Sequence, residues 1–86
     1  MANPKAIAFI QDCFVSGDTP ADNCTFIVNF HTADGTYSST NLTDVDVTQS
    51  EAQISGDLKT SVANSLNAGL NLSGPGSYAA ADIRLF

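Results

Sequence analysis

The sequence predicts an α+β fold: a two-layer sandwich of one small, mainly antiparallel β-sheet and one α-helix, in the order β-β-β-α-β. Three observations carry this prediction. Apolar and polar residues alternate over residues 25–31, as in a half-buried strand. Apolar residues then recur at every fourth position over residues 54–70, as on one face of a helix. Alternation returns over residues 78–86, which predicts a last strand.

The first two strands are predicted as an antiparallel hairpin. Residues 6–15 are apolar and aromatic on both parities, which indicates a strand that is partly covered on both faces. Residues 16–23 combine Ser, Gly, Asp, Pro and Asn, which favour a chain reversal. The strand at residues 25–31 follows, and its apolar side consists of Phe26, Val28 and Phe30.

A second hairpin is expected at Asp34 and Gly35, the dipeptide that type I′ turns favour because both central residues take positive φ. Residues 37–41 are polar, and we interpret them either as a short edge strand or as an extended crossing. Alternation resumes over residues 42–47, which we predict as the third strand, with an earlier start left open.

The helix carries the clearest local signal. Residues 48–51, Thr-Gln-Ser-Glu, fit a capping box, in which the Thr hydroxyl and the Glu carboxylate each accept from a backbone amide. We expect the helix over residues 49–68, with Gly69 as the left-handed residue after it. Its apolar stripe is Ile54, Leu58, Val62, Leu66 and Leu70. A Gly- and Pro-containing loop at residues 73–77 leads to the last strand.

Composition and charge exclude several classes of function. With 43% hydrophobic and 14% charged residues, residues 1–86 are expected to form a single globular domain. Nine Asp and Glu against three Lys and Arg give a net charge of −6, the opposite of the basic surface that phosphate binding requires. Direct nucleic-acid binding is therefore not expected. No apolar stretch approaches the roughly 20 residues of a membrane span, and no secretory signal is visible, so neither membrane binding nor export is expected.

Cys13 and Cys24 lie at the facing ends of the first two strands, where the hairpin brings them together. Two interpretations stay open: a disulfide that stabilises a small domain, or two small thiols kept reduced in the cytosol. Together with His31 they supply three soft ligands without the spacing of a zinc site, so no metal or other cofactor is expected. No pattern marks His31 or any Ser as part of a nucleophilic site, and we predict no enzyme and no catalytic residues.

The acidic residues gather near the first loop and on the third strand. No spacing among them matches a calcium loop, and one interpretation is a surface that keeps the protein soluble. The alternative hypothesis for function is a small acidic inhibitor, which binds a host nucleic-acid-binding protein by placing carboxylates where phosphates are expected. The residues that this inhibitor would present are Asp18, Asp22, Asp44 and Asp46.

Strand edges and the end of the chain favour a protein-binding function instead. Unpaired backbone groups on the third and last strands can pair with another chain. The chain ends in Phe86, an aromatic residue at a position that is commonly polar and frayed. We therefore predict a homo-oligomer or a larger protein assembly, with an interface formed by Tyr37, Leu85 and Phe86.

The chain is short, acidic, free of Trp and rich in Ser, Thr, Asn, Ala and Gly, with DVDVTQSEAQISGDLKTSVANSLNAGL as a strand and capped helix and ADIRLF as an abrupt end. In these respects the whole chain resembles small structural proteins of tailed bacteriophage particles. The resemblance implies a non-enzymatic decoration, cement or connector protein. Such a protein binds a capsid or tail surface and its own copies, and is assembled into the virion in the host cytoplasm.

Overall fold

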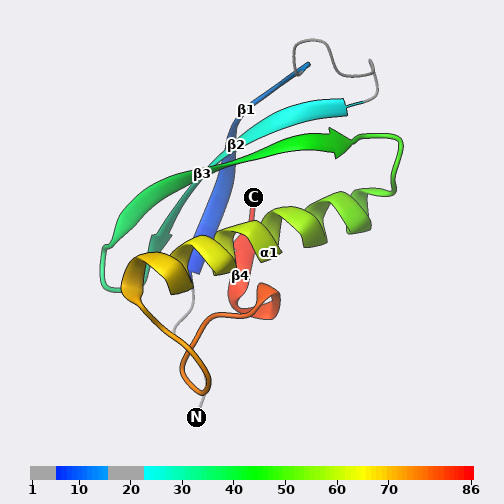
Figure 1. Ribbon diagram of the computed structural model, residues 1–86. Coiled ribbons are helices and arrows are strands. Elements are labelled where there is room, and N and C mark those ends of the chain that lie inside the picture. Colours follow the sequence, from blue (N-terminus) through cyan, green and yellow to red (C-terminus); the bar gives the residue numbers. More distant parts are fainter. Residues whose placement is uncertain (1–5, 16–22) are drawn as a thin grey trace.

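The computed structural model describes residues 6–15 and 23–86. Within them, four strands form one sheet in the spatial order β3-β2-β1-β4, and helix α1 lies across one face of it (Figure 1). The predicted α+β fold and its β-β-β-α-β order are confirmed. The elements are β1 (Ala6–Val15), β2 (Asn23–Thr32), β3 (Tyr37–Asp46), α1 (Glu51–Leu70), a short 3₁₀ helix η1 (Ala80–Asp82) and β4 (Ile83–Leu85).

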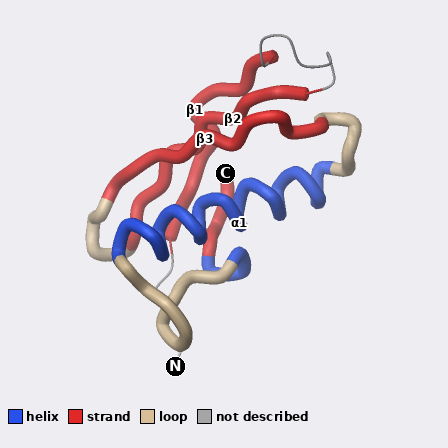
Figure 2. Tube along the Cα trace, in the orientation of Figure 1, coloured by secondary structure: helices blue, strands red, loops and turns tan. Residues whose placement is uncertain are grey.

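The sheet is mixed, with both longer strand pairs antiparallel. β1 pairs antiparallel with β2, and β2 pairs antiparallel with β3, so both predicted hairpins are confirmed. β4 lies beside the beginning of β1 (Figure 2). It runs parallel to β1 and places Ile83 opposite Ala6 and Leu85 opposite Ala8. Because β4 has only three residues, β1 has no strand on this side beyond Ala8 within the part of the chain that the structure describes.

A β-bulge at Gln11 determines which residues of β1 face the helix. The register with β2 shifts between Ile10 and Asp12, so one extra residue lies between them. Before the bulge the even-numbered residues of β1, such as Ala6 and Ala8, lie on the α1 side of the sheet. After it the odd-numbered residues, such as Cys13, lie on that side. The aromatic residues of β1 therefore stay on the face away from α1 on both sides of the bulge.

The hydrophobic core lies between α1 and the sheet. Small alanines on β1 and large apolar residues on β2 pack against the helix stripe, in which Leu58 and Val62 are fully buried. Leu70, the last residue of the predicted stripe, is exposed because α1 ends there. The buried apolar residues are Ala6, Ala8, Phe26, Val28, Phe30, Val45, Leu58, Val62, Ala63, Leu66, Tyr78 and Ile83.

The turn between β2 and β3 differs from the predicted type I′ turn. Gly35 has a φ of 95°, but Asp34 is not among the described residues with positive φ. The loop instead has three residues, 33–35, and is closed by a hydrogen bond from the Thr32 amide to the Thr36 carbonyl at 2.9 Å. The Asp34 carboxylate accepts from the Thr32 hydroxyl and from the Thr36 amide, and these bonds lower its pKa. β3 begins directly after this loop, so residues 37–41 are an edge strand and not a crossing.

The helix begins two residues later than predicted, and the capping box at residues 48–51 is wrong. Asp46 accepts hydrogen bonds from the Thr48 amide at 2.9 Å and from the Thr48 hydroxyl at 2.6 Å. The hydroxyl of Thr48, the expected cap, is therefore bonded to Asp46. The N-cap is Ser50, whose hydroxyl accepts from the Gln53 amide at 3.2 Å.

The helix also ends later than predicted, because Asn71 and not Gly69 takes the left-handed conformation, with φ 57°. The Leu72 amide donates to the Asn67 carbonyl at 2.8 Å and the Asn71 amide donates to the Ala68 carbonyl at 3.4 Å, the two bonds of a Schellman motif. Leu72 packs against the core, which favours ending the helix at this point.

The corrected cap predicts a difference between two hydroxyl residues. Ser50→Ala is expected to lower the free energy of unfolding by about 1 kcal/mol, because the Gln53 amide loses its acceptor. Thr48→Ala is expected to change it by about 0.5 kcal/mol or less, because Thr48 is an exposed residue outside the helix. Urea titration followed by circular dichroism measures both variants. A larger loss for Thr48→Ala than for Ser50→Ala would contradict the assignment of the cap.

Candidate protein-binding face

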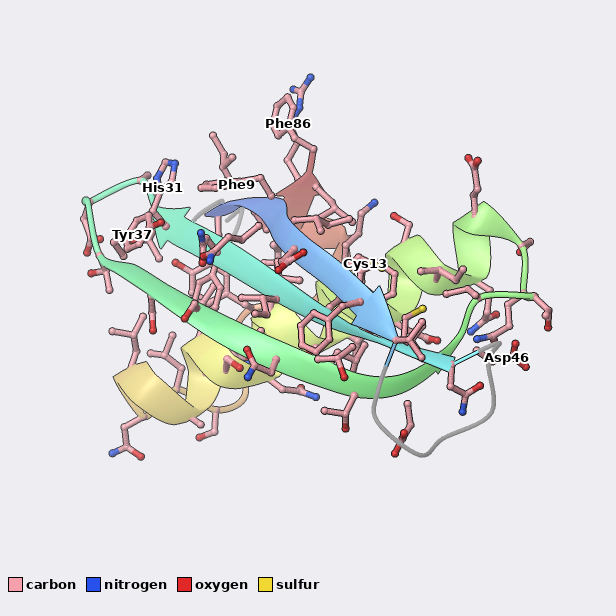
Figure 3. All side chains as sticks on the ribbon, turned by 90° about the horizontal axis from the view of Figure 1, so that it is seen from above. Phe9, Cys13, His31, Tyr37, Asp46 and Phe86 are labelled. Atoms are coloured by element: carbon pink, nitrogen blue, oxygen red, sulfur yellow. The ribbon has the colours of Figure 1, made fainter. Side chains whose placement is uncertain are left out.

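The sheet face away from α1, called the open face below, is built from alternate residues of the strands. Figure 3 looks onto this face, with α1 behind the sheet. The β1 residues of the open face pair with odd-numbered residues of β2. Asp12, the first residue after the bulge, also lies on this face because it pairs with Ile27. The open face consists of Ile7, Phe9, Asp12, Phe14, Asn23, Thr25, Ile27, Asn29, His31, Tyr37, Ser39, Asn41, Asp46, Arg84 and Phe86.

Large apolar side chains lie on this face over β1, at the end of the chain and at the beginning of β3. Five of them are between 37% and 66% exposed, with Phe86 the most exposed. Single exposed apolar residues are common on protein surfaces, but a contiguous set marks a surface that binds something. The five are Ile7, Phe9, Phe14, Tyr37 and Phe86.

Phe86 is fixed beside Phe9 by backbone pairing. The Phe86 amide donates to the Ala8 carbonyl at 2.9 Å, which extends the parallel pairing of β4 by one residue. The Arg84 guanidinium lies over the Phe86 ring, 5.2 Å from its centroid, in the geometry of a cation–π contact. The last aromatic residue is therefore held at the β4 edge of the sheet by two contacts (Figure 3).

Two polar residues of the open face lie under this apolar line. Asn29 is directly opposite Phe9, and Thr25 is directly opposite Phe14. Both polar side chains are buried, although none of the described helices covers this side of the sheet. The surface that the open face presents over β1 and β2 is therefore more apolar than its residue list suggests.

The β1 and β4 part of this face carries one charge of each sign, and Asp46, opposite Asn23 at the far end of β3, is a further carboxylate at an open-face position. In the described strands β1 and β4 it carries Asp12 after the bulge and Arg84 opposite Ile7. The other acidic residues that the structure describes belong to the turn after β2, to β3, to α1 and its start, and to η1. They are Asp34, Asp44, Asp46, Glu51, Asp57 and Asp82.

The structure separates the three predicted interface residues. Tyr37 lies opposite His31 on the open face, and Phe86 lies on the same face beside Phe9. Leu85 lies on the α1 side and is packed against the core. Sequence reasoning missed Ile7, Phe9 and Phe14, although apolar residues on both parities of residues 6–15 were a signal for them.

A groove of about 760 Å³ lies between β3 and α1, on the other side of the molecule from Phe86. Asp44 and Asp46, both predicted for the inhibitor, line it together with Asp57 of the helix. The hydroxyl and amide of Thr48 donate to Asp46 and hold its pKa below the usual value. Asp18 and Asp22, the other two predicted carboxylates, lie outside the described residues.

The two cysteines come together as the predicted hairpin requires. Cys13 pairs with Phe26 and Cys24 pairs with Val15, so the thiols are diagonal neighbours on the α1 side of the sheet. Both are free thiols here, Cys13 exposed and Cys24 partly buried. Desolvation and the neighbouring Cys24 thiol raise the pKa of Cys13. A disulfide between them stays a prediction.

Two further observations concern only residues 6–15 and 23–86. In this part of the chain no three His, Cys, Asp or Glu side chains gather closely enough to hold a metal ion. The helices found there lack the combination of length and apolar character that crossing a membrane requires.

The open face is thus defined by its own geometry, which brings Phe9 and Phe86 together from opposite ends of the sequence. Comparison of the chain with models of protein families, with curated proteins and with solved structures gave no match.

Proposed function

We propose that the protein is a non-enzymatic assembly protein, which binds other protein surfaces, including its own copies, through the open face. The observation that carries the proposal is the line of exposed apolar residues along β1 and the chain end: Ile7, Phe9, Phe14 and Phe86.

The pattern of β1 supports this function. Its sequence is apolar on both parities, which is typical of a strand covered on both faces. In the single chain the α1 side of β1 is buried only at Ala6 and Ala8, whereas Ile10 and Val15 on that side are exposed. The apolar residues of β1 on the other face are exposed along its length. A protein partner on the open face would cover them.

The residue types on the open face also suit protein binding. Interfaces are enriched in aromatic residues and Arg at their centres, where each apolar side chain that is removed from water contributes about 1 kcal/mol or more. Phe9, Phe86 and Arg84 lie side by side in this face. The resemblance to small structural proteins of tailed bacteriophage particles favours a decoration, cement or connector role, with a capsid or tail surface as a further partner.

The proposal is tested by removing two aromatic side chains from the open face. We expect the wild-type chain to sediment as a species heavier than the 8.9 kDa monomer, in low and in high salt, because apolar contacts are little screened. The double variant Phe9→Ser/Phe86→Ser is expected to sediment as a monomer at the same concentrations. Sedimentation velocity over a concentration series measures both, with circular dichroism as the check on folding.

The matched control is Val47→Ser/Leu70→Ser, which removes two exposed apolar side chains outside the sheet. It is expected to associate as the wild type does. A wild-type chain that stays monomeric at every concentration would contradict assembly through its own copies. Binding to a protein that disappears as salt rises would favour the acidic inhibitor, with Asp44 and Asp46 as its contact residues.

A further inference from the structure

We propose that the partner of the open face is a second copy of the chain, packed face to face about a twofold axis that passes near Phe9. The axis is parallel to the two sheets and perpendicular to β1. This inference rests on the proposed function and assigns the partner and the register of the same surface.

The size of the open face fits such a dimer. The Cα trace extends over 42 × 21 × 21 Å, so the rectangle that encloses its elongated side has an area of roughly 900 Å². A stable interface of standard size buries about 800 Å² per partner, which is nearly all of this side. A second copy offers a surface of the same size and the same apolar character, and two sheets pack face to face at a spacing of about 10 Å.

The two charges on β1 and β4 determine the register. Arg84 lies opposite Ile7, and Asp12 lies beyond the bulge. Their partners on β2, His31 and Ile27, are four residues apart, which puts the two positions roughly 13 Å apart at 3.3 Å per residue. Phe9 is the open-face residue closest to the midpoint between them. A twofold axis at this midpoint exchanges the two ends of β1. It therefore places each Arg84 near the partner's Asp12 and each Phe9 near the partner's Phe9.

The lateral offset between the charges is compatible with contact. β4 is the strand next to β1, so Arg84 stands about 4.8 Å to the side of the line through Asp12. The long Arg side chain spans this distance. Its guanidinium already lies over the Phe86 ring on the open face, which orients it before a partner binds.

Among the described residues, most of the carboxylates behind the net charge of −6 lie outside β1 and β4. Described acidic residues other than Asp12 belong to the turn after β2, β3, α1 and η1, including the groove carboxylates Asp44, Asp46 and Asp57. A strongly basic partner would be attracted to that groove, whereas the open face carries one charge of each sign along β1 and β4. A surface with the same balanced charges complements it, and a second copy supplies this surface.

The test uses two charge-reversal variants, Arg84→Glu and Asp12→Arg, alone and mixed. Alone, each variant places like charges together at both ends of the dimer, and its dimer dissociation constant is expected to rise about tenfold or more. In an equimolar mixture, both contacts between unlike chains become attractive. We expect a one-to-one dimer whose dissociation constant is within about threefold of the wild-type value. Mixing the two variants leaves the charges within each chain unchanged and alters only the charges that meet between chains. A rescue by mixing therefore requires that Arg84 and Asp12 meet across the dimer.

The matched control pair is Asp57→Arg and Lys59→Glu, which reverses one charge of each sign on α1 instead of on the open face. Each control variant is expected to dimerise as the wild type does. Sedimentation equilibrium gives the masses and the dissociation constants, and circular dichroism verifies that every variant is folded.

The outcomes separate the inference from the proposed function. If the single variants dimerise normally, or if their mixture does not, the twofold register is overturned. The proposed function still holds in that case, provided that Phe9→Ser/Phe86→Ser abolishes association. If the wild-type chain is monomeric at all concentrations, the second-copy partner and assembly through own copies are both contradicted.

Discussion

Leu58→Ala is expected to lower the free energy of unfolding by about 2 to 5 kcal/mol. Leu58 is 1% exposed and lies in the middle of the α1 stripe, between the helix and the sheet. Truncation removes its packing and leaves a cavity, because the surrounding core relaxes only in part. A chain of this length is stabilised by roughly 5 to 10 kcal/mol in total, so the variant loses a large share of its stability.

The control for this prediction is Leu70→Ala in the same helix. Leu70 is 41% exposed, and its truncation is expected to cost about 1 kcal/mol or less. Ala favours the helix at least as much as Leu, so neither variant weakens α1 through propensity. Urea titration measures both. Equal losses for the two variants would mean that stability does not depend on the burial of Leu58.

Asn67→Ala is expected to lower the free energy of unfolding by about 2 to 3 kcal/mol. The Asn67 side chain donates to the Tyr78 carbonyl at 2.9 Å and accepts from the Tyr78 amide at 2.7 Å. Tyr78 itself is buried, so truncation of Asn67 leaves both backbone groups without these bonds in a place that water reaches poorly.

Two further variants show which bonds of Asn67 matter. Asn64→Ala removes an exposed side chain one turn earlier in α1 and is expected to cost about 0.5 kcal/mol or less. Asn67→Asp keeps an acceptor for the Tyr78 amide but loses the donor to its carbonyl, so an intermediate loss is expected. Urea titration of the three variants gives the order. A loss for Asn67→Ala no larger than that for Asn64→Ala would contradict the role of the side-chain pair.

The order of elements is predictable from sequence because it depends on periodicities that are written along the chain. The fourfold spacing from Ile54 to Leu66 and the alternation around Val28 each identify an element and its buried side. Element ends depend on competition between neighbouring polar groups. Asp46 engages Thr48, so the helix begins at the next available cap, and a motif match alone does not reveal this competition.

The open face was harder to predict, because it depends on pairing between distant residues. Nothing local to Phe86 indicates that it extends a parallel strand beside Phe9, and nothing local to Gln11 indicates a bulge. The bulge matters for the surface. Without it, the residues of β1 after position 10 would exchange faces, and Phe14 would lie on the α1 side.

Because β1 pairs with β4, the aromatic surface of the open face forms only in the completely folded chain. This parallel pairing closes a loop between Ala6 and Ile83 that contains β2, β3 and α1, so its entropic cost is offset only when the intervening chain has folded. Phe9 and Phe86 become neighbours through this closure. A partly folded chain therefore lacks the complete aromatic surface, and the surface itself reports that the whole fold has formed.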